Sequence, residues 1–144
     1  MNVLVYLAIL VVSCLYAGMR GGPPERLAAL TLVAAIIASV FTPASNAIRF
    51  QGIEYGIMAV DTACLVAVVA IAIHAQRYWP MWMAAILLDI VLTHALMLTP
   101  SLMPWSYSVM IAAWNYPIPI ILAIGTWRHR ARLQTYGSDA AWNR

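Results

Sequence analysis

Three ionisable side chains, Asp61, Asp89 and His94, lie inside long apolar stretches of this 144-residue chain. Placing such a group in hydrocarbon costs roughly 2.5–3.5 kcal/mol, so each marks either a function or a specific partner. A helix rises about 1.5 Å per residue, which places Asp61 about 10 Å and His94 about 8 Å from the same end of their helices. Because consecutive antiparallel helices are usually neighbours, we expect Asp61 and His94 to pair.

The position of Asp89 predicts a second layer of polar groups in the membrane, about 15 Å from the helix end near which Asp61 and His94 lie. Asn115 reaches the same depth in the last apolar stretch, and Thr93 extends the polar face one turn beyond Asp89. A proton or solute path could run from Glu54 through the Asp61–His94 level to the Asp89–Asn115 level, or these groups could be hydrogen-bonded contacts between helices. We favour helix contacts, because almost no polar residue continues the path from Asp89 to the opposite edge.

Pro117 and Pro119 interrupt the last apolar stretch. Each proline removes a backbone N–H and thereby frees a carbonyl, that of Ala113 or Asn115. The sequence therefore predicts a kinked helix at this point. A ligand pocket around Trp114, Asn115 and Tyr116 is an alternative interpretation of the same segment.

Catalytic and cofactor chemistry have little support in the sequence. The sequence lacks lysine, so it has no side-chain amine to form a Schiff base with retinal or pyridoxal. Cys14 and Cys64 each stand alone within an apolar run. No Cys-x-x-Cys or His-x-x-x-His spacing predicts a metal site, and no nucleophile–base pair is visible. We predict a protein that is not an enzyme and has no cofactor or metal; a pigment or haem bound through His94 is the alternative.

The elements that carry these residues are predicted to be transmembrane helices. The chain is 64% hydrophobic and only 9% charged, where a soluble domain carries about 25% charged residues. Crossing a bilayer takes about 20 apolar residues. We predict an all-α bundle of five spans within residues 1–127, at residues 2–19, 25–42, 54–75, 81–99 and 105–127, followed by a polar tail at 128–144. The second span is rich in alanine, so we expect it to pack closely.

The positions of the arginines predict the orientation of the bundle. Seven of the eight fall on one side of a five-span topology, and Arg49 alone falls on the other. Arginine is enriched on the cytoplasmic side of membranes, so the C-terminus should be cytoplasmic and the N-terminus outside. Tyr78, Trp79, Trp82 and Trp127 should mark the cytoplasmic interface.

The absence of recognisable chemistry predicts a non-enzymatic accessory subunit of a larger bacterial inner-membrane complex, respiratory or photosynthetic. Arg128, Arg130 and Arg132 form a basic tail that should face anionic lipids or a partner protein. Nothing in the charge distribution indicates nucleic acid. A small proton or solute carrier that uses the intramembrane Asp and His residues is the first alternative, and a membrane ligand-binding sensor is the second.

Overall fold

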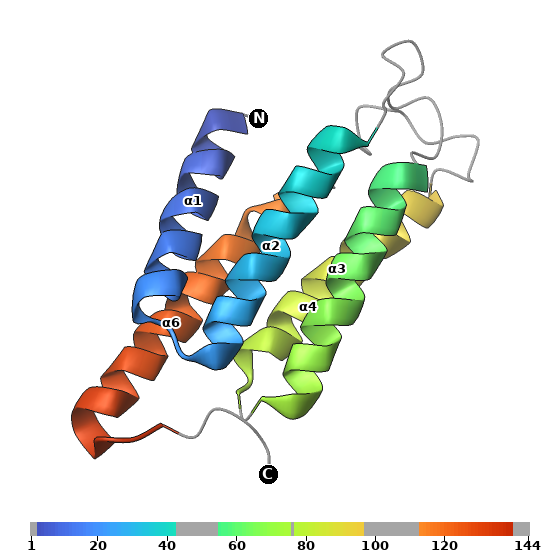
Figure 1. The fold of residues 1–144 in the computed structure, drawn as a ribbon. Helices are drawn as coiled ribbons and strands as arrows, with labels where there is room; N and C mark the ends of the chain where they lie inside the picture. The colour runs from blue at the N-terminus through green and yellow to red at the C-terminus, as the bar shows by residue number, and fades with distance from the viewer. Residues whose placement is uncertain (1–2, 43–54, 76, 97–112, 140–144) are drawn as a thin grey trace.

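The computed structural model describes residues 3–42, 55–75, 77–96 and 113–139, together with all their side chains except those of residues 95 and 96. All five elements described in it are α-helices (Figure 1). Their bounds are α1, Val3–Arg20; α2, Pro23–Phe41; α3, Tyr55–His74; α4, Trp79–Leu96; and α6, Pro117–Tyr136.

The helix bounds agree closely with the sequence for four helices and differ for the fifth. Helices α1 to α4 begin and end within about three residues of the predicted positions, and Pro23 and Pro24 begin α2 as first-turn prolines commonly do. The fifth helix continues to Tyr136, although its span was predicted to end at Trp127. The all-α prediction is confirmed, and α1, α2 and α3 are long and apolar enough to cross a membrane.

The helices form a closed ring in which each helix packs against its neighbours in the sequence. Contacts join α1 to α2, α2 to α3, α3 to α4 and α4 to α6, and α6 closes the ring against α1. Helix α2 also reaches α6, so it touches three other helices. The α1–α2 turn, the α3–α4 turn and the C-terminal end of α6 all lie at one end of the bundle, which we call the turn end (Figure 1).

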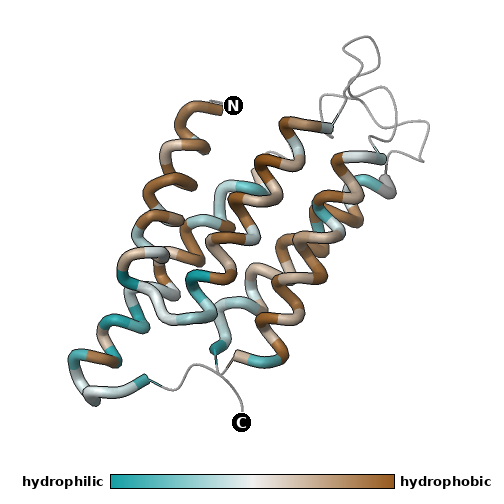
Figure 2. Tube along the Cα trace, in the orientation of Figure 1, coloured by the Kyte–Doolittle hydropathy of each residue, from teal (hydrophilic) through white to brown (hydrophobic). Residues whose placement is uncertain are grey.

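Apolar side chains are found both inside the bundle and on its surface. The core contains Val68, Met83, Leu87, Ile90 and Leu122, each less than 4% exposed. Large apolar side chains also cover the outer surfaces of the helices, and hydrophilic residues gather towards the turn end (Figure 2). Because a soluble monomer rarely exposes large contiguous apolar patches, this surface fits a hydrocarbon environment.

Pro117 and Pro119 lie in the first turn of α6 and not in the interior of a helix. Residues 113–115 are helical, and the chain turns at Tyr116, whose N–H donates to the Ala113 carbonyl at 3.4 Å. Proline is well accommodated in a first turn, since the N–H groups there have no partner within the helix. The helical hydrogen bonding is therefore interrupted at Tyr116, whose backbone keeps right-handed helical angles (φ −65°, ψ −40°), and the Ala113 carbonyl is satisfied locally.

Candidate functional site

The turn end of the bundle contains a buried network of charged side chains centred on Asp139. Three donors from two parts of the chain converge on this carboxylate. Arg77 Nη2 and His129 Nδ1 each lie 2.5 Å from Asp139 Oδ2, and Arg132 Nε lies 2.8 Å from Oδ1. The Asp139 side chain is 4% exposed and that of Arg77 is 7% exposed, so these are charge-assisted hydrogen bonds shielded from water.

Glu25 adds a second buried carboxylate to the same network. Its side chain is fully buried in the first turn of α2, where a carboxylate also interacts favourably with the helix dipole. Trp79 Nε1 donates to Glu25 Oε1 at 3.2 Å, and Arg77 Nε lies 3.9 Å from the same oxygen. Arg77 therefore sits between two acids and joins α2 to the chain that follows α6.

Two glycines make the close approach of these side chains possible. A Cβ at Gly22 would lie 2.9 Å from His129 Cε1 and 3.1 Å from Glu25 Oε2. A Cβ at Gly125 would lie 2.9 Å from three atoms of the Trp79 indole. The absence of a side chain at Gly22 thus lets the α1–α2 turn pack directly against His129. Its absence at Gly125 lets α6 pack directly against Trp79. This arrangement corrects the prediction for Trp79, which is 8% exposed and belongs to the core.

The geometry of the network shifts two pKa values. Burial lowers the pKa of Arg77, and the nearby Asp139 carboxylate opposes this effect. Burial alone would raise the pKa of Asp139, but hydrogen bonds from Arg132 and His129 and the charge of Arg77 outweigh it, so this pKa lies below its ordinary value. Asp139 is therefore an anion at neutral pH, held by at least two permanent cations.

The lowered pKa of Asp139 predicts a loss of stability in acid. A carboxyl whose pKa is depressed by folding stabilises the protein above its unfolded-state pKa, near 3.9, and this contribution disappears as pH falls through the folded value. We expect the free energy of unfolding in detergent micelles to fall as pH drops below about 4. Asp139→Asn should flatten this dependence. An equally steep acid dependence in Asp139→Asn would contradict the assignment.

The structure brings Asp61 and His94 together, on α3 and α4. His94 Nε2 lies 3.0 Å from Asp61 Oδ2, and the His94 side chain is 1% exposed. The two side chains are therefore within hydrogen-bond distance of each other. The pair joins adjacent helices away from the turn end.

Asp89, Thr93, Asn115 and Tyr116 lie on α4 and immediately before α6, in different local environments. Thr93 is buried and its hydroxyl donates to the main-chain carbonyl of Asp89 at 2.7 Å, while the Asp89 side chain is half-buried. Asn115 is also half-buried. Tyr116 packs edge-on against Tyr6 of α1, with ring centroids 5.7 Å apart.

The predicted basic tail divides into residues with different environments. Residues 128–136 continue α6 and are not an extended tail. Arg128 is exposed and Arg130 half-buried, whereas Arg132 turns inward to Asp139. The chain reverses at Gly137, which adopts φ 69° as the C-cap, and this reversal brings Asp139 back to the helix it has just left. Hydrogen bonds from His129 and Arg132 to Asp139 therefore hold residues 137–139 against α6.

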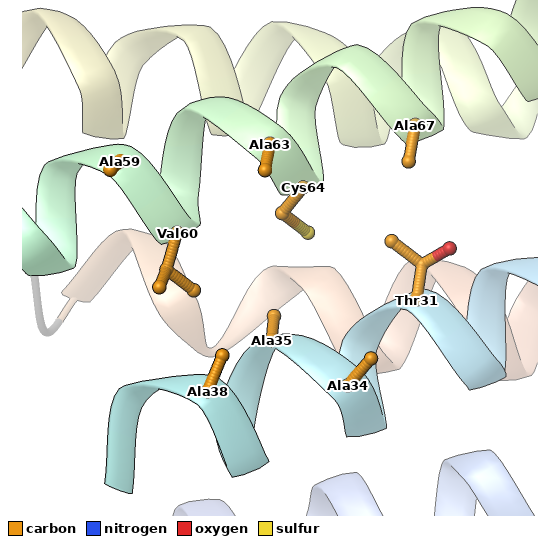
Figure 3. A pocket seen from close by; sticks show the side chains of 9 residues that line it. All are labelled: Thr31, Ala34, Ala35, Ala38, Ala59, Val60, Ala63, Cys64 and Ala67. Atoms are coloured by element: carbon orange, nitrogen blue, oxygen red, sulfur yellow. The ribbon is translucent and has the colours of Figure 1, made fainter. Parts of the chain in front are cut away.

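A groove of about 500 Å³ lies between α2 and α3 (Figure 3). Figure 3 shows small side chains on both walls facing one another across it. Ala34 and Ala38 on α2, and Ala59, Ala63 and Ala67 on α3, recur every four residues, so each set lies along one helix face. Thr31, Ala35, Val60 and Cys64 complete the lining. Trp114, Asn115 and Tyr116, the residues of the predicted ligand pocket, are not part of it.

Metal coordination gains no support from the described ranges, in which no three His, Cys, Asp or Glu side chains are placed to hold an ion. The charged network was not predicted as a site from the sequence; its members include Glu25, Arg77, His129 and Asp139. The sequence did contain a signal for this network. Glu25 and Asp139 are acidic residues predicted to lie on the same side of the membrane as seven arginines, and buried carboxylates need such cationic partners.

Comparison with known proteins adds no relative to this geometry: no protein-family model, no curated protein sequence and no solved structure matches the chain. The groove, the Asp61–His94 pair and the charged network are therefore the features of the molecule from which a function can be inferred.

Proposed function

We propose that the protein is a non-enzymatic accessory subunit of a larger membrane complex, and that the groove between α2 and α3 receives one transmembrane helix of another subunit. The observation that carries this proposal is the open, alanine-lined groove. Small residues let helix backbones approach closely, which favours van der Waals packing between helices in lipid.

The groove fits a helix better than a polar ligand. Its two walls are formed by the apolar helices α2 and α3. Alanines at four-residue spacing on these walls form shallow ridges of the kind found at helix–helix contacts. The groove is open, since Ala34, Ala38, Ala59 and Ala63 are all exposed. An occupant would thus contact α2 over residues 31–38 and α3 over residues 59–67 without disturbing the ring.

The same proposal includes a five-span topology in a bacterial inner membrane with the turn end in the cytoplasm. The turn end carries six arginines on or beside the α1–α2 turn, the α3–α4 turn and the end of α6: Arg20, Arg26, Arg77, Arg128, Arg130 and Arg132. Their gathering at one end supports this orientation through the enrichment of arginine on the cytoplasmic side. Exposed Tyr78, Trp82 and Trp127 would lie at that interface.

A proton carrier is the weaker alternative. The Asp61–His94 contact could hold a proton, but a buried apolar layer of Val68, Met83 and Leu87 separates its end of the bundle from the turn end. The pair is better explained as a contact that fixes α3 against α4.

Filling the groove should abolish partner binding. We expect wild-type protein, extracted from its native membrane in mild detergent, to migrate with another membrane protein at fixed stoichiometry, and Ala63→Leu to migrate alone. The added side chain would occupy the space required by the partner backbone.

The matched control is Ala85→Leu, on an exposed face of α4 outside the groove, which should retain the partner. Both variants should unfold at the wild-type temperature, because both added side chains have room. Wild-type protein that migrates as a monomer, or equal partner loss in both variants, would refute the groove.

A further inference from the structure

The donors around Asp139 form a cradle for an anion, made of Arg77, His129 and Arg132. They come from the α3–α4 connection and from α6, and so belong to the helix bundle. The anion that occupies them comes from the chain beyond the end of α6, linked to the helix by Gly137 and Ser138. The cradle and its occupant are therefore separable: the occupant could leave while the helices stay in place.

The cradle offers more donors than the carboxylate uses. Arg132 Nη2 is buried and, among the described residues, has no hydrogen-bond partner. A carboxylate presents two oxygens, and both are already engaged by Arg77, His129 and Arg132. A phosphate group presents at least one more acceptor oxygen, and the planar guanidinium fork matches phosphate geometry.

The charge of the cradle also requires an anion. With Asp139 in place, two guanidiniums face two carboxylates, Glu25 and Asp139. Asp139 is the closer of the two carboxylates paired with Arg77, at 2.5 Å against 3.9 Å for Glu25. An uncompensated buried charge is strongly unfavourable, so a displaced Asp139 would need replacement by another anion.

The surroundings of the cradle indicate where that anion comes from. Tyr78, Trp82 and Trp127 are 82%, 68% and 63% exposed, and they flank the cradle in sequence. Exposed aromatic residues of this kind sit at the headgroup level of a bilayer. These aromatic residues support a position of the cradle near the depth of lipid phosphate.

We propose that Arg77, His129 and Arg132 form a binding site for a phosphate group, supplied by the headgroup of an anionic lipid, and that Asp139 occupies this site when no such lipid is bound. The inference does not depend on the helix-binding groove, which lies on α2 and α3. It assigns Asp139 as a competitor of the ligand and Arg132 as a ligand-binding residue.

The first test is lipid binding by the full-length protein, measured by native mass spectrometry from micelles doped with phosphatidic acid. Asp139→Asn should bind phosphatidic acid at least about tenfold more tightly than wild type, because the competing carboxylate is gone. The double variant Asp139→Asn/Arg132→Gln should lose that gain, and the matched control Asp89→Asn should behave as wild type. Unchanged affinity in Asp139→Asn, or a gain that survives Arg132→Gln, would overturn the proposal.

A second measurement keeps the test valid if Asp139→Asn fails to fold. Ser138 is exposed, so a spin label at Ser138→Cys, with Cys14 and Cys64 replaced by alanine, reports whether residues 137–139 are held. Vesicles of phosphatidic acid in phosphatidylcholine should increase the mobility of the label, and phosphatidylcholine alone should not. A label that stays immobile at every content of phosphatidic acid would overturn the proposal.

Inorganic phosphate, added to the same spin-labelled protein in phosphatidylcholine vesicles, identifies the source of the ligand. Release by phosphatidic acid but not by inorganic phosphate supports a lipid headgroup. Release by inorganic phosphate alone would overturn the lipid assignment and leave a site for soluble phosphate.

Discussion

Arg77→Ala is expected to destabilise the protein by about 3–5 kcal/mol, the usual effect of removing one partner from a buried ion pair. Arg77 lies between Glu25 and Asp139, whose side chains are 0% and 4% exposed. Without the guanidinium, two carboxylates remain buried at one end of the bundle. Unfolding by sodium dodecyl sulfate in mixed micelles, followed by circular dichroism, measures the loss.

Arg128→Ala provides the matched control, because Arg128 is exposed and lies on α6 near the same end. Exposed ion pairs contribute at most about 1 kcal/mol, so this variant should unfold close to wild type. Similar losses in the two variants would show that the effect comes from net charge and not from the buried network.

Gly125→Leu is expected to cost about 3 kcal/mol, because overpacking and a lost hydrogen bond act together. Any Cβ at this position would lie 2.9 Å from three atoms of the Trp79 ring, so the indole must move. A displaced Trp79 would no longer donate to Glu25, whose Oε2 already lacks a hydrogen-bond partner among the described residues. The unfolding assay should register both effects.

Gly18→Leu is the control for Gly125→Leu, since a Cβ at Gly18 would have nothing within 4 Å. It should be neutral or stabilise α1 by up to about 1 kcal/mol, because leucine has a higher helix propensity than glycine. A destabilisation by Gly18→Leu equal to that of Gly125→Leu would mean that added apolar volume, and not contact with Trp79, is responsible.

The helices could be predicted from sequence because the relevant signals are local. The apolar length of each stretch predicted helices α1 to α4. The pairing of Asp61 with His94 could be expected because depth along antiparallel helices follows from residue count alone. The extension of α6 to Tyr136 was missed, because residues 128–136 are helical yet polar, and apolar length carries no information about them.

The charged network could not be predicted because it depends on long-range packing. Glu25, Arg77 and Asp139 are far apart in sequence, and only the closure of the ring by α6 against α1 and α2 brings their elements together. Trp79 was assigned to the membrane interface from its type, but the absence of a side chain at Gly125 creates the space that buries it. Complementary packing between positions that are far apart in the chain leaves no periodic pattern in the sequence.

The central claim is that the α2–α3 groove holds a helix of another subunit. A photo-crosslinking amino acid in place of Ala63, in protein expressed in its native membrane, tests it most directly. The account predicts one discrete crosslinked product with a membrane protein from this position, and none from the same amino acid in place of Ala85 on α4. Crosslinks from Ala63 to lipid alone, or the same products from both positions, would contradict it.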